Sequence, residues 1–218
     1  FKEHKLFLFK VNSMKYFIDY ILLIIIFPIF LVAFPIISLL ILLLDSGPVI
    51  YSQNRVGLNG KEFKLHKFRT MSVASNEEIH KEHYKDLSQN KKIEPSLTPD
   101  DPIRIENDDR ITKIGTFLRK TSLDELPNLL NVLQGQMSLV GPRPLVKYES
   151  DLYGEYKEKR NSIKPGITGL AQIQGRLDLS LQERLYWDIK YVDEKSFNYD
   201  LIIILKTIYS VLSRRGAN

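Results

Sequence analysis

The sequence predicts an α/β fold with mostly helices, in which a small β-hairpin, an N-terminal re-entrant membrane helix and amphipathic interfacial helices surround one cytosolic domain. The run from Tyr20 to Leu44 contains no charged residue. Two strand-like runs flank an Asn59-Gly60 pair, which is typical of a tight hairpin. Elsewhere apolar residues recur at helical spacing. We therefore expect a basic lead-in (1–18), a membrane helix (19–46) and a cytosolic domain that ends in an interfacial helix (47–218).

The apolar run is too long for the core of a signal peptide, and no small-residue cleavage site follows it. A helix over Tyr20–Leu44 would be about 37 Å long, which exceeds the roughly 30 Å of a bilayer core. Pro28 and Pro35 disfavour a straight helix. Basic residues lie on both sides, and the positive-inside rule places both flanks in the cytoplasm. A re-entrant helix satisfies both observations, and a kinked single span is the alternative.

Composition and charge narrow the classes of partner. The formal charge of +5 suits anionic partners such as lipid head groups and nucleotides. Basic residues are not interleaved with aromatic ones as in an RNA-binding surface, so no nucleic acid is expected. The chain contains no cysteine, which excludes disulfides and cysteine-based metal sites. The lead-in mixes large apolar residues with lysines, which is typical of a segment that binds the membrane interface. The lysines are Lys2, Lys5, Lys10 and Lys15.

Strands are expected over 49–56 and 62–69. Lys67 and Arg69 then share one face of the second strand, because side chains alternate along a strand. Two cations so placed suit a phosphate, and they equally suit a solvated face. The polar segment 75–107 predicts a surface helix and an exposed loop, and its His80 and His83 lack a third metal ligand at the usual spacing.

The stretch from Ser122 to Pro144 is the most informative part of the chain. Ser122 and Glu125 have the spacing of a capping box, which predicts that a helix begins there. Gly135 predicts its end. One face of this helix should be buried through its leucines: Leu126, Leu129, Leu130 and Leu133.

A stiff turn follows the two acids of this helix start further along the chain. The run Gly141-Pro142-Arg143-Pro144 predicts a rigid turn that fixes the direction of Arg143. Together with Asp124 and Glu125, this arginine is suited to hold a metal and a phosphate. The alternative is that both acids only cap the helix.

Further elements surround these residues. A helix over Ile111–Lys120 should deliver Arg119 just ahead of the acidic pair, with Ile111, Ile114, Phe117 and Leu118 facing inward. The loops Lys164–Gly169 and Gly175-Arg176 allow close backbone approach to a ligand, or are ordinary connections. Helices are expected near 179–192 and 199–212, and the second is short for a membrane span.

A series of motifs occurs in a fixed order: Lys67-Phe68-Arg69-Thr70-Met71, Arg119, Ser122-Leu123-Asp124-Glu125-Leu126-Pro127, Asn131-Val132-Leu133, Gly141-Pro142-Arg143-Pro144, Pro165-Gly166-Ile167-Thr168-Gly169 and Gly175-Arg176. On these motifs the chain, from about Lys15 onward, resembles the bacterial monotopic phosphoglycosyl transferases. These are the initiating sugar-1-phosphate transferases of capsule, exopolysaccharide and O-antigen (lipopolysaccharide) synthesis. The family's membrane helix usually breaks at a Ser-Pro pair, whereas Pro28 and Pro35 here each follow a phenylalanine.

The resemblance implies that a sugar-1-phosphate passes from a UDP-sugar to undecaprenyl (polyprenyl) phosphate, giving a polyprenyl-diphosphate-sugar and UMP. It also implies a covalent phosphosugar-aspartate intermediate, Mg2+ as cofactor, and a catalytic domain on the cytoplasmic face of the bacterial inner membrane. Asp124 is then the nucleophile, and Asp124 with Glu125 holds the metal. The expected phosphate and substrate contacts are basic: Lys67, Arg69, Arg119, Arg143 and Arg176.

Two other functions stay open. A membrane-associated glycosyltransferase would move the sugar alone and release UDP, but its usual Asp-x-Asp motif is not apparent. A non-catalytic module that binds anionic lipid would explain the basic flanks, but not Asp124-Glu125 followed by the turn at 141–144. The sequence predicts neither the sugar nor whether the chain forms a homo-oligomer.

Overall fold

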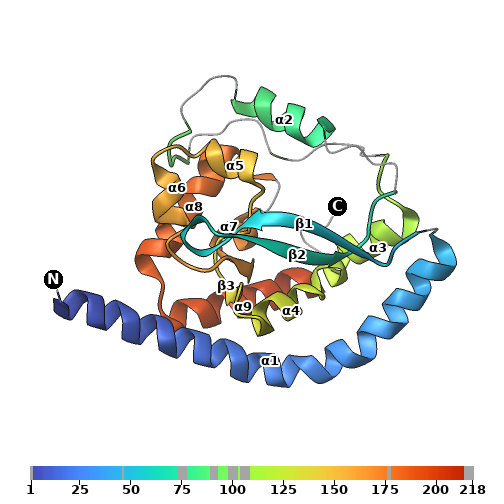
Figure 1. The fold of residues 1–218 in the computed structure, drawn as a ribbon, viewed down its shortest axis with the longest axis horizontal. Coiled ribbons are helices and arrows are strands. Elements are labelled where there is room, and N and C mark those ends of the chain that lie inside the picture. Colours follow the sequence, from blue (N-terminus) through green and yellow to red (C-terminus); the bar gives the residue numbers. More distant parts are fainter. Residues whose placement is uncertain are drawn as a thin grey trace.

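The computed structural model describes residues 2–45, 47–72, 78–88, 93–97, 103, 109–175 and 178–213. It confirms a mostly helical fold with a small antiparallel hairpin (Figure 1). The described elements are α1 (Lys2–Leu44), β1 (Ile50–Val56), β2 (Glu62–Phe68), α2 (Glu78–Ser88), α3 (Lys113–Lys120), α4 (Asn128–Leu133), β3 (Ser138–Val140), α5 (Lys147–Asp151), α6 (Tyr156–Arg160), β4 (Gly166–Thr168), α7 (Leu170–Gln174), α8 (Leu181–Glu194) and α9 (Phe197–Leu212), with 3-10 turns at Leu58–Gly60 and Leu123–Glu125.

Helix α1 runs without interruption through both of its prolines, Pro28 and Pro35. It curves along one side of the domain instead of breaking into two helices (Figure 1). The helix is thus curved and continuous, as expected of one that its prolines keep from being straight, and its re-entrant placement in a membrane stays a prediction. Within the described residues, Lys15–Leu44 is the one helix long and apolar enough to cross a membrane. Only 17% of the most apolar 18-residue stretch of this helix is buried, whereas the core helix of a soluble protein is mostly buried.

The inner face of α1 packs on the domain through residues at helical spacing: Leu23, Phe30, Ile37 and Ile41. In the N-terminal half of α1, Asp19 Oδ2 accepts a hydrogen bond from Ser138 Oγ at 2.6 Å. Lys15 Nζ donates to Asp200 Oδ2 at 2.6 Å and to Val140 O at 2.9 Å. Lys15 is thus a mostly buried ion-pair partner, and its expected place at a lipid interface is wrong.

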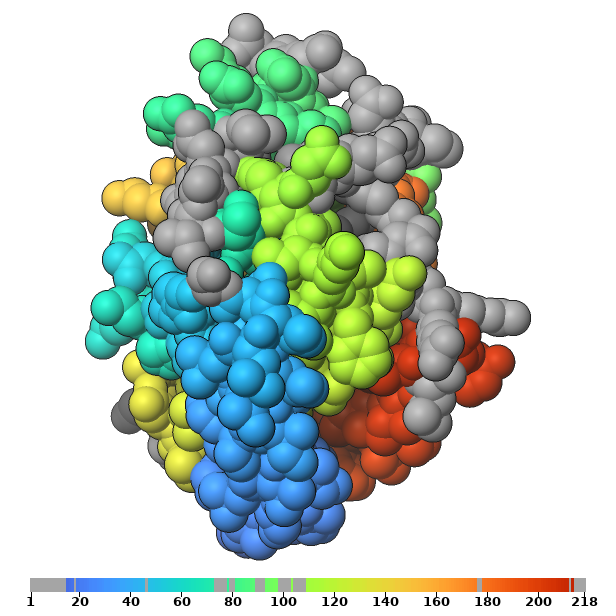
Figure 2. Space-filling model, turned by 90° about the vertical axis from the view of Figure 1, so that its right-hand side faces the viewer, coloured from blue at the N-terminus to red at the C-terminus, as the bar shows by residue number. Residues whose placement is uncertain are grey.

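Between residues 24 and 44, the outer face of α1 is apolar and exposed: Ile24, Ile25, Ile29, Leu31, Val32, Ile36, Leu39, Leu42, Leu43 and Leu44. Figure 2 looks at the end of the molecule where the C-terminal half of α1 lies beside α3, with α9 next to them. Two expectations fail here, because Phe117 of α3 is 52% exposed and Leu133 of α4 is 50% exposed. In α9, Leu201, Ile202, Leu205, Ile208 and Tyr209 are also exposed.

The predicted hairpin is present. Strands β1 and β2 pair antiparallel from Ile50 opposite Phe68 to Val56 opposite Glu62. Asn59 and Gly60 connect them with φ angles of 53° and 77°, both in the left-handed region that asparagine and glycine tolerate. The hairpin places Lys67 near the end of β2, on the side that faces the Leu123–Glu125 turn.

A second pair of strands, β3 and β4, is parallel and holds the turn at 141–144. A Cβ atom on Gly166 would lie 2.1 Å from the backbone nitrogen of Gly141, and one on Gly169 would lie 2.1 Å from its carbonyl oxygen. The glycine-rich loop therefore permits close approach to another backbone segment. In the loop at 164–169, Gly166 and Gly169 thus approach the backbone of Gly141.

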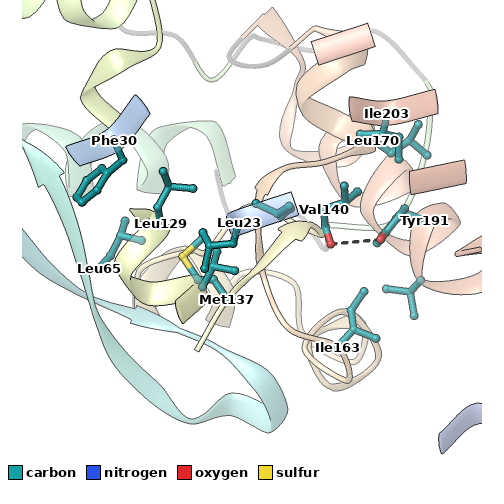
Figure 3. Close-up of a cluster of buried hydrophobic side chains, with 13 residues drawn as sticks. Leu23, Phe30, Leu65, Leu129, Met137, Val140, Ile163, Leu170, Tyr191 and Ile203 are labelled. Atoms are coloured by element: carbon teal, nitrogen blue, oxygen red, sulfur yellow. Dashed lines mark hydrogen bonds between the residues drawn. The ribbon is translucent and has the colours of Figure 1, made fainter. Parts of the chain in front are cut away.

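The largest core cluster joins elements from the whole chain (Figure 3). Leu23 and Phe30 of α1 meet Leu65 of β2, Leu129 of α4 and Val140 of β3. Tyr191 of α8 donates from its hydroxyl to Val140 O at 3.3 Å. The apolar helix, the hairpin and the β3 strand are thus packed as one unit.

Asn131 ties α4 to β2 in this core and is fully buried. Its Nδ2 donates to Lys64 O at 2.8 Å and to Gln136 Oε1 at 2.7 Å, while its Oδ1 accepts from His66 N at 3.2 Å. Both ends of the amide are therefore satisfied, which is the state expected for a buried polar group.

We predict that Asn131→Leu lowers the free energy of unfolding by about 3 kcal/mol, because it leaves two backbone groups of β2 unpaired in the core. Denaturant unfolding in detergent measures this change. An unfolding free energy equal to that of the wild type would show that the amide does not link α4 to β2.

Candidate active site

The Ser122–Glu125 segment does not form the predicted capping box. Ser122 has a φ of 57°, in the left-handed region, and its side chain makes no cap hydrogen bond. The next three residues form a 3-10 turn, and α4 begins only at Asn128. The expected helix start is therefore wrong by several residues. The consequence is chemical, because the carboxylate of Glu125 turns towards basic side chains instead of a helix N-terminus.

Glu125 is the centre of the resulting cluster. Its Oε1 accepts from Lys67 Nζ of β2 at 2.6 Å and from Arg143 Nη1 of the 141–144 turn at 2.9 Å. Burial by itself would raise the pKa of Glu125, but the charges of Lys67 and Arg143 outweigh it and hold this pKa below its usual range. Glu125 is therefore ionised and bound on both sides.

Asp124 lies at the edge of the same cluster. Its Oδ2 is 4.0 Å from Lys67 Nζ, so this ion pair is much looser than that of Glu125. Burial raises the pKa of Asp124, while the charges of Lys67, Arg119 and Arg143 oppose this rise. Two adjacent carboxyl groups therefore differ in environment, which is a common feature of sites where such groups have different roles.

The turn that carries Arg143 is held from two sides. Buried Arg160 donates from Nη2 to Arg143 O at 2.7 Å and forms an ion pair of 2.7 Å with Asp188. Arg55 donates from Nη1 to Pro144 O at 3.3 Å. Sequence analysis did not identify these supports, because Arg160 and Asp188 lie in separate helices and no motif connects them.

The remaining predicted site residues divide into three groups. Arg119 belongs near the cluster: its Nε donates to Thr70 Oγ1 at 2.9 Å, and its charge acts on Asp124. Arg69 does not join it, since its buried guanidinium donates to the carbonyl oxygens of Pro48, at 2.6 Å, and of Asp45, at 3.4 Å. It thereby ties the end of α1 to the hairpin. Arg176 lies outside the described residues.

The donor set is compatible with Mg2+ but does not form a complete protein cage. The described part of the chain holds no group of three or more His, Cys, Asp and Glu residues placed to bind a metal. Mg2+ usually keeps several waters and binds one or two carboxylates together with substrate phosphates. Asp124 fits this pattern, whereas Oε1 of Glu125 is already bound by two cations.

A narrow pocket adjoins the cluster. It is lined by residues of β1, β2, α4, the 141–144 turn and β4: Arg55, Leu65, Lys67, Glu125, Asn128, Arg143, Pro144, Gly166 and Ile167. All three basic residues in this lining, Arg55, Lys67 and Arg143, belong to the hairpin or the turn. The pocket therefore includes the Glu125 ion pairs and residues of the hairpin, and Asp124 is not one of its lining residues.

We predict that Glu125→Gln lowers the free energy of unfolding at pH 7 by about 2 kcal/mol, because Lys67 and Arg143 lose their shared anion. A carboxyl group whose folded pKa is depressed stabilises the protein above its unfolded pKa, about 4.3, and loses this effect as the pH falls towards the folded value. The difference between wild type and variant should therefore shrink below about pH 4.3. Denaturant unfolding across this range tests it, and a difference that is independent of pH would contradict it.

Comparisons with known proteins identify relatives of the chain. The undecaprenyl-phosphate galactose phosphotransferase of Salmonella typhimurium is 45% identical over 173 residues, which cover 79% of this chain and 35% of that protein. The UDP-glucose:undecaprenyl-phosphate glucose-1-phosphate transferase of Escherichia coli is 38% identical over 189 residues, 83% of this chain and 36% of that protein. The chain thus spans about a third of these two relatives.

A shorter relative is matched over most of its length. The exopolysaccharide production protein ExoY of Rhizobium meliloti is 42% identical over 175 residues, which cover 79% of this chain and 74% of that protein. The family model for bacterial sugar transferases matches residues 10–214, which include most of α1, the cluster around Glu125 and α9. The chain belongs to the bacterial sugar transferase family.

Proposed function

We propose that this protein transfers a sugar-1-phosphate from a UDP-sugar to undecaprenyl phosphate through a covalent intermediate on Asp124. The names of its relatives support the substrates. The observation that supports the mechanism is the unequal engagement of the two acids. Glu125 is bound by two cations at 2.6 Å and 2.9 Å, while Asp124 lies 4.0 Å from Lys67 and keeps oxygen lone pairs for reaction.

In the first half-reaction, an oxygen of the Asp124 carboxylate attacks the β-phosphorus of the UDP-sugar, the one that bears the sugar. The new bond joins this oxygen to phosphorus, the bond between the β-phosphorus and the bridging oxygen breaks, and UMP leaves with that oxygen. The attacking group and the diphosphate are both anionic. Nearby cations are therefore needed, and Arg119, Lys67 and Arg143 supply positive charge around Asp124.

In the second half-reaction, a phosphate oxygen of undecaprenyl phosphate attacks the same phosphorus. The phosphorus–oxygen bond to Asp124 breaks, which restores the carboxylate and gives the polyprenyl-diphosphate-sugar. Mg2+, when bound, would neutralise part of the diphosphate charge, and Asp124 is the protein ligand we expect for it, with Glu125 as the second candidate.

The membrane helix has a role in this scheme. A lipid phosphate lies at head-group depth, so the site must be held close to the membrane surface. The exposed apolar face of α1 supports insertion into the bilayer, and Asp19 and Lys15 fix α1 to β3, the strand directly before the 141–144 turn. We propose a re-entrant placement of α1 in the bacterial inner membrane, with the site on the cytoplasmic side.

Nucleotide release tests the proposal. The protein in detergent is incubated with a panel of UDP-sugars, Mg2+ and undecaprenyl phosphate. We expect continuous release of UMP that depends on the lipid phosphate. Release of UDP would instead indicate a glycosyltransferase that moves sugar alone. No release from folded protein, with retention on anionic vesicles, would favour a lipid-binding module.

In the same assay, Asp124→Asn should reduce lipid-dependent UMP release by about 10³-fold or more, because the amide cannot serve as the nucleophile. The substitution preserves size, so circular dichroism and the melting temperature should stay close to those of the wild type. Turnover within tenfold of the wild type would exclude Asp124 as the nucleophile.

A further inference from the structure

Two residues that line the pocket beside Glu125 each carry a buried polar atom without a hydrogen-bond partner among the described residues: Oδ1 of Asn128 and Nε of Arg55. Asn128 is only 2% exposed. Buried polar groups are rarely left unpaired, because desolvation then goes uncompensated. An unpaired amide that lines a pocket therefore points to a ligand or a water that completes it.

Arg55 is held in place by its other nitrogens. Its Nη2 donates to Gln53 Oε1 at 2.6 Å and its Nη1 donates to Pro144 O at 3.3 Å. The remaining Nε–H is a donor, and Asn128 Oδ1 is an acceptor. A hydroxyl group within reach of both atoms would satisfy them, because it accepts one hydrogen bond and donates another.

The size and position of the pocket favour the same ligand group. The free space is narrow and takes a group of about the size of a water molecule, so it suits a hydroxyl and is too small for a uracil ring. A phosphate dianion could not donate to Asn128 Oδ1.

We infer that Asn128 and Arg55 form a subsite for a hydroxyl group of the UDP-sugar, on its sugar or its ribose. This inference rests on the proposed function, because it takes a UDP-sugar as the donor. The subsite lies beside Glu125, Lys67 and Arg143, so a hydroxyl bound there would orient the donor relative to Asp124. It would also give the protein a means to distinguish sugars.

Asn131 supplies a matched control, one turn further along α4. Both asparagines are buried, but the amide of Asn131 has all three of its hydrogen bonds within the protein, whereas Asn128 Oδ1 has none. If Asn128 is kept for a ligand, Asn128→Leu should leave the melting temperature unchanged or raise it. Asn131→Leu should lower it by about 5 °C or more.

Isothermal titration calorimetry in detergent measures the affinity of the wild type and both variants for UMP, 2′- and 3′-deoxy-UMP, UDP-sugars and their monodeoxy analogues. We expect removal of one particular hydroxyl to weaken binding to the wild type by about tenfold. The same removal should have no effect on Asn128→Leu, which separates the lost hydrogen bond from a steric effect of leucine. In folded Asn131→Leu the hydroxyl should matter as in the wild type.

The ligands also distinguish the source of the hydroxyl. An effect confined to deoxy-UMP assigns the subsite to the ribose, and one confined to deoxy-sugars assigns it to the transferred sugar. Equal penalties in wild type and Asn128→Leu would overturn the subsite, and the pocket would then hold water only. If the wild type binds the UDP-sugars but shows no penalty for any deletion, the subsite alone fails. If it binds none of them, the proposed function fails as well.

Discussion

The arrangement of the site depends on one carboxylate, that of Glu125. Its Oε1 binds Lys67 of β2 and Arg143 of the 141–144 turn, so three segments far apart in sequence meet at one atom. A buried anion between two cations is stable only when the surrounding backbone holds all three in place. The hairpin, the paired strands β3 and β4, and the Arg160–Asp188 pair provide this support.

The local parts of the fold could be predicted from sequence, and the contacts between distant parts could not. The Asn59-Gly60 hairpin and the long apolar helix follow from turn chemistry and composition. Lys15 was misassigned because its partner, Asp200, lies 185 residues away. Phe117 was wrongly expected in the core. Its spacing marks an apolar face of the helix, but spacing does not show whether protein or lipid covers that face.

The sequence indicated which residues form the site, but it did not indicate the backbone conformation that places them. Asp124, Glu125, Lys67 and Arg143 stand out in the sequence, and the structure brings them together. The left-handed Ser122 that turns the acids away from a helix cap is not visible in a pattern that matches a capping box. Asn128 also escapes notice, because only its missing hydrogen-bond partner distinguishes it from Asn131, another buried asparagine of the same helix.

The central claim is that Asp124 carries the sugar-phosphate between the two half-reactions, and the mass of the intact protein tests it most directly. The protein is incubated with Mg2+ and its UDP-sugar without lipid phosphate, quenched in acid and analysed by mass spectrometry. We predict a gain of one sugar-phosphate that maps to Asp124 and disappears when undecaprenyl phosphate is added. An unmodified mass throughout, with UMP formed only when both substrates are present, would contradict the account and indicate direct transfer between the two substrates.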